Sequence, residues 1–255
     1  MYNLNYYIDL IIVLMAKDFK IKYKHTLLGY LWAVAHPLIF AAILYIAFKN
    51  IVRIKVDNYG LFLIVGIFPW QWFANSSYLS ARTLILNASI IKKIRFPKSM
   101  LPLSTVLIEM LHFLISWIVI IFFLFINNQD TFYWSWIYGF PLITFIQLVL
   151  MFGFGLAVSS LNVFFRDTER IVTLLITMLF YLTPVIYPLN MVPQSFRLFL
   201  FLNPLTGVVE LWRAIFLEGS LSWEWLCFTT GYAFLALFLG SVIFRSLKGR
   251  FAEVL

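Results

Sequence analysis

Six apolar stretches, each near the length that crosses a membrane as a helix, run through this chain of 255 residues. A transmembrane helix needs roughly 20 predominantly apolar residues. The candidate spans are residues 33–52, 60–82, 101–126, 139–163, 171–188 and 224–245, and the fifth is short and holds Pro184 near its end. Only 12% of the residues are charged, about half the share found in a soluble domain, so most of the surface must face lipid. The pattern predicts an all-α integral membrane protein with six transmembrane helices, built as one domain over residues 1–255.

The residues before the first span predict an amphipathic helix over 4–24. Ile8, Ile11, Ile12, Met15, Phe19 and Tyr23 share one face at helical spacing, and Asp9, Lys17, Lys20 and Lys24 share the other. Such a helix lies in the plane of the membrane interface, where its lysines face lipid headgroups. It is either a plain surface anchor or a moving gate or docking surface.

The segment 189–223, before the last span, is too apolar for a plain loop. Its two halves, 195–202 and 205–217, are rich in Phe, Leu, Val and Trp, yet neither is long enough to span a membrane. We expect two short re-entrant helices, broken at Asn203-Pro204. Irregular backbone at membrane depth is tolerated where it is buried in protein or lines a cavity. The segment therefore either caps a pathway from the outside or is a packing plug.

Lysine and arginine are unevenly divided between alternate loops. With the N-terminus inside, the inner segments hold fourteen, which are Lys17, Lys20, Lys22, Lys24, Arg82, Lys92, Lys93, Arg95, Lys98, Arg166, Arg170, Arg245, Lys248 and Arg250. The outer segments hold five, which are Lys49, Arg53, Lys55, Arg197 and Arg213. Since cytoplasmic loops carry the excess of positive residues, we expect both termini in the cytoplasm.

Two basic segments follow the second and fourth spans on the predicted cytoplasmic side. Their candidate contact residues are Lys92, Lys93, Ile94, Arg95, Phe96 and Pro97 in one, and Arg166, Asp167, Glu169 and Arg170 in the other. The chain has no G-x-x-x-x-G-K-[ST] loop to cradle the phosphates of ATP, so uphill transport would need energy from another subunit. We interpret both segments as docking contacts for a cytoplasmic partner, with Ile94 and Phe96 as apolar anchors. Solvated positive-inside loops are the simpler alternative.

Aromatic residues make up 20% of the chain and fall into two groups. Trp70, Trp72, Trp134, Trp136, Trp223 and Trp225 lie near the expected outer interface, where an aromatic belt explains them. Phe40, Tyr45, Phe180 and Tyr181 fall instead within spans one and five. Because aromatic faces stack on sugar rings, these four are candidate channel-lining side chains, and packing against lipid is the rival explanation.

Glu109 and His112 lie one turn apart within the third span. Ionisable residues inside a membrane are functional suspects, but a contact with a neighbouring helix explains them equally well. The chain has neither H-E-x-x-H nor G-x-S-x-G, and its histidines show no spacing of metal ligands. We therefore expect no catalytic site, no metal site and no cofactor in this chain.

Four motifs occur in order along the sequence. They are Leu28-Gly29-Tyr30-Leu31-Trp32 with Pro37-Leu38, then Phe165-Arg166-Asp167, then Thr183-Pro184-Val185-Ile186-Tyr187-Pro188, and finally Asn203-Pro204-Leu205 continuing to Glu210-Leu211-Trp212-Arg213. Over nearly the whole chain they resemble the permease subunits of ABC-type polysaccharide exporters, which carry O-antigen, capsule or teichoic acid. The likeness to the O-antigen permeases is the strongest.

The resemblance implies a homodimer of six-span subunits paired with two copies of a cytoplasmic ATPase subunit, which would hold the ATP and Mg. It implies a channel lined mainly by spans one and five. The implied substrate is an undecaprenyl-pyrophosphate-linked polysaccharide, moved from cytoplasm to periplasm across the bacterial inner membrane. No nucleic-acid partner is implied, and membrane lipids surround the subunit. The two basic segments match the positions of the family's coupling elements.

The resemblance also implies a substrate entrance. In this family the turn that holds Leu28 and Gly29 lies near the cytoplasmic mouth of the channel, where the lipid pyrophosphate is thought to enter. Lys20, Lys24 and Arg82 would then attract the pyrophosphate by charge.

Several alternatives stay open at this level. The substrate class could be capsule or teichoic acid instead of O-antigen, or a small molecule carried by an ABC exporter with the same membrane fold. Outside transport, the chain could be a membrane enzyme acting on lipid-linked glycans or a scaffold for other membrane proteins. The lack of converging acids or metal ligands counts against an enzyme, and the apparent re-entrant cap counts against a scaffold.

Overall fold

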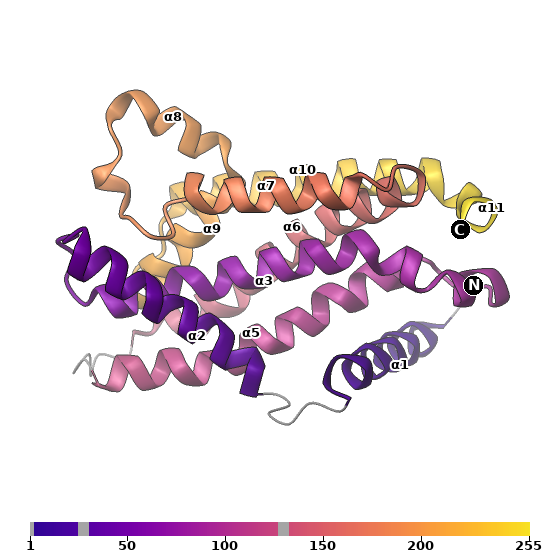
Figure 1. Ribbon diagram of the computed structural model, residues 1–255, viewed down its shortest axis with the longest axis horizontal. Helices are drawn as coiled ribbons and strands as arrows, with labels where there is room; N and C mark the ends of the chain where they lie inside the picture. Colours follow the sequence, from indigo (N-terminus) through magenta and orange to yellow (C-terminus); the bar gives the residue numbers. More distant parts are fainter. Residues whose placement is uncertain (1–2, 25–30, 127–132) are drawn as a thin grey trace.

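The computed structural model describes residues 3–24, 31–126 and 133–255, and the regular elements in these ranges are all helices. In chain order they are α1 (Leu4–Tyr23), α2 (Leu31–Tyr45), η1 (Ile46–Ile51), α3 (Tyr59–Leu86), α4 (Ala88–Lys93), α5 (Met100–Ile126), α6 (Ser135–Phe164), α7 (Thr168–Leu182), η2 (Leu189–Met191), α8 (Gln194–Leu202), α9 (Pro204–Arg213), η3 (Ala214–Glu218), α10 (Trp223–Leu247), η4 (Lys248–Arg250) and α11 (Phe251–Val254). The long helices run along one axis, and both termini lie at one end of the bundle, here called the N/C end (Figure 1).

Among the described residues, three helices are long and apolar enough to cross a membrane: Met100–Leu124, Ser135–Phe164 and Trp223–Val254. Helix α8 and the run Pro204–Glu218 form a pair bent by 98°, which is either a broken span or a re-entrant loop. The predicted first and fifth spans are occupied by shorter helices, α2 with η1 and the 15-residue α7. The predicted all-α class with several apolar helices is confirmed, and the count of six spans stays a prediction.

Helix α3 is the centre of the bundle, packed against α2, α5, α6, α7 and α9 (Figure 1). Its hydroxyl residues Ser76, Ser77 and Ser80 are buried. Asn162 of α6 donates a hydrogen bond to the Ala81 carbonyl oxygen of α3 at 2.8 Å. Small polar side chains let helices approach closely inside a bilayer and link them by hydrogen bonds. The buried serines lower the hydropathy of α3, and we attribute them to its close packing at the centre of the bundle.

The break predicted at Asn203-Pro204 is present. The Asn203 side-chain oxygen accepts a hydrogen bond from the Leu205 amide at 3.0 Å, and Pro204 begins α9. An Asn cap followed by proline at the first helical position is a strong signal for the start of a helix. The Asn side chain accepts a hydrogen bond from an amide that has no partner inside the helix, and proline has no amide hydrogen that would need one. Helix α9 is buried in the bundle, whereas α8 exposes Phe196, Leu198, Phe199 and Leu202. Whether this pair re-enters a membrane stays a prediction.

The aromatic belt is wrong for two of the six tryptophans assigned to it. Trp70 and Trp72 of α3 are only 5% and 2% exposed. The Trp72 ring stacks on Phe113 of α5, with centroids 4.9 Å apart, because these large rings fill the core between the two helices. Trp134 and Trp223 are largely exposed, as a belt requires.

Helices α6 and α10 meet backbone to backbone at two glycines. A Cβ added at Gly240 would lie 2.0 Å from the Gly153 carbonyl oxygen, and one added at Gly153 would lie 2.4 Å from the carbonyl carbon of Ala236. By contrast, a Cβ at Gly231, also in α10, would meet nothing within 4 Å. The absence of side chains at the first two positions sets the distance between these helices.

We therefore expect Gly240→Ala to destabilise the protein by about 1–3 kcal/mol, the usual cost of overpacking a tight contact. The matched variant Gly231→Ala should be neutral or stabilising by up to about 1 kcal/mol, because alanine is the better helix former. Thermal unfolding of the purified protein in detergent measures both. Equal melting temperatures for the two variants would contradict the close contact.

Candidate functional site

Helix α1 lies against α5. Leu14 is 4% exposed and packs with Leu10 into a cluster that includes residues of α3, α4 and α5. Ile8 and Ile12, both on the predicted apolar face, are 47% and 57% exposed, as an apolar face turned toward lipid requires. Helix α1 therefore has apolar residues on more than one side, and Leu10 and Leu14, one turn apart, are those that meet the protein.

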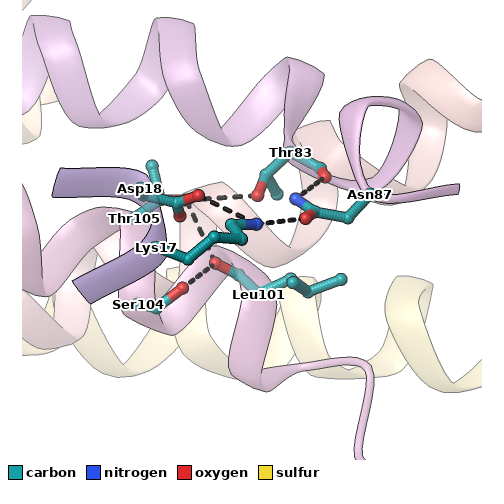
Figure 2. Close-up of polar contacts among 7 residues, drawn as sticks. All are labelled: Lys17, Asp18, Thr83, Asn87, Leu101, Ser104 and Thr105. Carbon is teal, nitrogen blue, oxygen red and sulfur yellow. Dashed lines mark hydrogen bonds and ion pairs between the residues drawn. The ribbon is translucent and has the colours of Figure 1, made fainter. Parts of the chain in front are cut away.

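The second half of α1 is fixed by polar contacts to the N/C ends of α3 and α5 (Figure 2). The Lys17 ammonium donates to the Asn87 side-chain oxygen and pairs with Asp18 at 2.9 Å. Asn87 in turn donates to the Thr83 carbonyl oxygen at 2.8 Å, and Thr105 of α5 donates to the Thr83 hydroxyl at 3.2 Å. The expectation that the helix lysines face headgroups is wrong for Lys17, which turns inward because Asn87 offers it a buried acceptor.

Deeper in the bundle, Lys22 reaches the acid within α5. Its ammonium nitrogen lies 2.6 Å from Glu109 Oε1, and Glu109 Oε2 lies 3.3 Å from His112 Nδ1. The Glu109 side chain is 1% exposed and the Lys22 side chain 39%. Burying a carboxylate alone is expensive, and a cation with hydrogen bonds offsets the cost. A contact with a neighbouring helix was one of the alternatives for Glu109; that contact is present, and the helix is α1.

The predicted substrate entrance is described only in part. Leu28 and Gly29 lie outside the described residues. Lys20 and Lys24 are exposed. Arg82 is not a free cation, since its Nε lies 3.0 Å from Glu169 Oε1. The structure thus joins a residue assigned to the entrance with one assigned to ATPase coupling.

The two predicted coupling segments both lie at the N/C end, beside α11. Lys92 and Lys93 end the short helix α4, which contacts α11. The other segment also lies beside α11, because the Phe164 ring at its start lies next to the Phe251 ring of α11, with centroids 6.2 Å apart. The charged residues Lys92, Lys93, Arg95, Arg166, Asp167 and Arg170 are exposed, and Glu169 is half-buried.

The two apolar anchors proposed in the first segment differ in exposure. Ile94 is 58% exposed and free to meet a partner. Phe96 is packed on the chain's own cluster of Phe244, Phe251 and neighbouring residues, and Pro97 beside it is also partly buried. Docking through Phe96 would therefore require it to leave that cluster.

The four candidate channel aromatics do not share one surface in a single chain. Phe40 and Phe180 face each other across α2 and α7, with centroids 5.5 Å apart, and Phe180 is 8% exposed. The Tyr45 and Tyr59 ring centroids are 6.1 Å apart. Tyr45 also lines a cavity of about 610 Å³ between α2, α3 and α5. Tyr181 is 65% exposed on the open side of α7. Tyr45 and Tyr181 are exposed and could touch a ligand, Phe40 is half-buried, and Phe180 is buried.

A buried arginine is the main feature that sequence reasoning missed. Arg213, counted among the outer-loop charges, is 4% exposed, so that assignment is wrong. Its guanidinium donates to the Pro184 and Val185 carbonyl oxygens, the latter at 2.7 Å, and to Glu210 at 3.0 Å. The cation also lies 3.6 Å from the centre of the Phe62 ring. An acid three residues before an arginine in an apolar run was the available signal, because such a cation needs a partner to be buried.

Three more hydrogen bonds join residues of the last two motifs to each other and to neighbouring helices. Tyr59 donates to the Ile186 carbonyl oxygen at 2.8 Å, and the Asn203 side-chain amide donates to the Thr183 hydroxyl at 2.8 Å. The Trp212 ring nitrogen donates to Gln147 at 2.8 Å. The motifs at 183–188 and 203–213, far apart in sequence, are therefore two halves of one polar contact.

Comparison with known proteins shows which proteins this chain is similar to. Residues 9–217 match the family model described as ABC-2 type transporter. The chain is 46% identical to the O-antigen export system permease protein RfbA of Klebsiella pneumoniae, over 100% of this chain and 98% of that protein. It is 31% identical to the protein of the same name from Myxococcus xanthus, over 97% and 95%. It is 24% identical to the polysialic acid transport protein KpsM of Escherichia coli, over 91% of each.

Replacing Lys22 by methionine should loosen α1 from the bundle, because among the described residues His112 is then the remaining partner of Glu109. We expect hydrogen exchange of the α1 amides to accelerate about fivefold or more, consistent with about 1–2 kcal/mol for a charged hydrogen bond. The exposed Lys20→Met is the matched control and should leave exchange unchanged. Equal exchange in the two variants would show that Lys22 does not hold α1.

Proposed function

The chain belongs to the ABC-2 type transporter family, and from that membership we propose that it is the membrane permease of an ATP-driven polysaccharide exporter. The observation that carries the proposal is full-length similarity to proteins named for O-antigen export, joined by a more distant protein named for polysialic acid transport. All of these names concern long polymers of sugars. A small-molecule exporter and a membrane enzyme are correspondingly disfavoured.

The proposed substrate is a polysaccharide linked to undecaprenyl pyrophosphate, of the O-antigen kind, with capsule and teichoic acid as the alternatives. The proposed working unit is a homodimer of six-span subunits in the bacterial inner membrane, each forming a single permease domain. The exposed side of α7, with Tyr181, Leu174 and Met178, supports pairing, because the second copy would cover apolar surface that the single chain leaves open. Helices α2 and α7 would then border a shared channel.

Energy comes, on this proposal, from two copies of a cytoplasmic ATPase that hold ATP and Mg, while the permease itself carries no cofactor. The exposed basic residues at the N/C end support an inward position for that end, and on this proposal both termini lie in the cytoplasm. The excess is clearer once Arg213 is removed from the outer loops, since Lys49, Arg53, Lys55 and Arg197 then remain there.

The contacts suggest how a push from the ATPase would travel. A force on the segment around Arg166 and Arg170 reaches α3 through the Glu169–Arg82 ion pair. The force then passes from α3 to α1, because Lys17 of α1 donates to Asn87 at the end of α3. We propose that this chain of contacts moves α1 and α2 and opens the entrance, while the segment 190–217 guards the exit.

The proposal is tested with the purified chain and its ATPase partner reconstituted in lipid vesicles. We expect the isolated chain to hydrolyse no ATP and to leave lipid-linked glycan chemically unchanged. The complex should hydrolyse ATP faster when lipid-linked glycan is supplied. Turnover of the glycolipid by the isolated chain would instead establish a membrane enzyme.

Reversing two charges of the second coupling segment tests the docking assignment. Arg166→Glu with Arg170→Glu should weaken ATPase association at least about tenfold, since two repulsive contacts replace two attractive ones at an interface. Arg53→Glu with Arg197→Glu makes the same change of charge at the opposite end and should leave association intact. Co-purification of the ATPase measures both, and full association and export in the first variant would refute the docking role.

Shortening one exposed aromatic tests the channel assignment. Tyr181→Ala should slow polymer export about threefold with assembly unchanged, since stacking on a ring contributes about 0.5–1.5 kcal/mol. Tyr138→Ala removes a similarly exposed tyrosine from α6 and is the control. The rate of surface glycan appearance is the readout, and equal rates in the two variants would return Tyr181 to ordinary packing.

A further inference from the structure

A cavity of about 540 Å³ opens at the N/C end between the start of α5, the middle of α6 and the end of α10. Its apolar part is formed by Phe152, Leu156 and Phe244, of which the last two are buried. Its polar part carries three cations, Lys98, Arg245 and Lys248. We call this cavity the basic pocket. Its volume falls in the range of roughly 300–1,000 Å³ that is typical of ligand sites.

The charge of the basic pocket is uncompensated within the described part of the chain. No acidic residue lines it, and no described carboxylate pairs with Lys98, Arg245 or Lys248. Lys98 is held in place, since its ammonium donates to the Lys248 carbonyl oxygen at 3.3 Å and lies 5.6 Å from the centre of the Phe251 ring. Arg245 and Lys248 are exposed. The first turn of α5 begins beside Ser99, and its amide dipoles add to the positive field.

Cations set above an apolar floor, at the end of membrane helices, fit the two unlike parts of a phospholipid. The phosphate would lie against Arg245 and Lys248, and the upper acyl chain would lie on Phe152, Leu156 and Phe244. Basic pockets between membrane helices bind anionic headgroups in this way. A zwitterionic headgroup would bring its own ammonium group toward three cations, so the pocket should prefer a lipid with net negative charge.

We propose that the basic pocket binds the phosphate of an anionic membrane phospholipid such as phosphatidylglycerol. The occupant is a resident lipid and not the transported one, because none of the residues that line the pocket belongs to α2 or α7. This site goes beyond the proposed function and does not depend on it. If that function holds, the lipid also bears on coupling, since Phe96 and Pro97 of the first coupling segment line the same pocket. A bound lipid would hold that segment against α10.

The test is native mass spectrometry of the full chain in detergent, with phosphatidylglycerol or phosphatidylcholine added. We expect the wild-type chain to retain phosphatidylglycerol in preference to phosphatidylcholine. Arg245→Gln with Lys248→Gln should lower phosphatidylglycerol retention about 25-fold, since each of the two cations strengthens binding to an anionic lipid about fivefold. The charge-conserving pair Arg245→Lys with Lys248→Arg should restore retention.

A matched control separates the pocket from general positive charge. Lys55→Gln with Arg250→Gln removes one lysine and one arginine that do not line the pocket, and it should retain phosphatidylglycerol as the wild type does. Equal retention in the pocket variant and the control, or equal retention of the two lipids by the wild type, would overturn the proposal. Displacement of phosphatidylglycerol by a polyprenyl pyrophosphate would assign the pocket to the transported lipid, and displacement by the ATPase subunit would make it a docking surface. Either result would also overturn it, and none of these readouts requires export to occur.

Discussion

The buried Arg213 guanidinium is the contact on which the arrangement of the bundle depends. Helix α7 ends at Leu182, so the carbonyl groups of Pro184, Val185 and Ile186 lack partners inside a helix. Unpaired backbone is costly away from water, and irregular segments persist in membranes only where protein satisfies them. Arg213 supplies donors to two of these carbonyls and Tyr59 supplies one to the third. In this way α3, the end of α7 and the buried helix α9 are fixed together.

The buried Arg213 guanidinium also explains why an acidic residue, Glu210, and a glycine, Gly66, lie beside it. Glu210 offsets the buried charge of Arg213, as a cation in this setting requires. A Cβ at Gly66 of α3 would lie 3.0 Å from the Arg213 guanidinium and 3.2 Å from the Val185 carbonyl oxygen, so a larger residue would press on both. The motifs at 183–188 and 203–213 are thus a structural joint.

The helices themselves could be predicted from apolar length, turn signals and proline, and the break at Asn203-Pro204 was placed correctly. The errors concern direction and partners. The inward turn of Lys17 depends on Asn87, 70 residues later, and the burial of Trp70 and Trp72 depends on rings supplied by other helices. Helical spacing assigns residues to faces but does not say which face meets the protein and which meets lipid. The Arg82–Glu169 ion pair could not be predicted from the sequence either, because each residue was interpreted within its own segment.

Transport requires that a movement at one end of the permease reaches the other end while the contacts around Arg213 stay intact. The central contacts are buried and involve several elements at once, whereas α1 is attached by Leu14 and by two partly exposed lysines, Lys17 and Lys22. Attachments of this kind can open at lower free-energy cost than a core, which suits a moving element. We therefore expect α3, α6, α9 and α10 to stay rigid and α1 to move.

The most direct test of the central claim is depletion of this protein from the cell that produces it, followed by analysis of lipid-linked glycans on each side of the inner membrane. The account predicts that a polyprenyl-linked polymer accumulates on the cytoplasmic side and is lost from the cell surface. An unchanged distribution of glycans, in a strain without a second exporter of the same polymer, would contradict it.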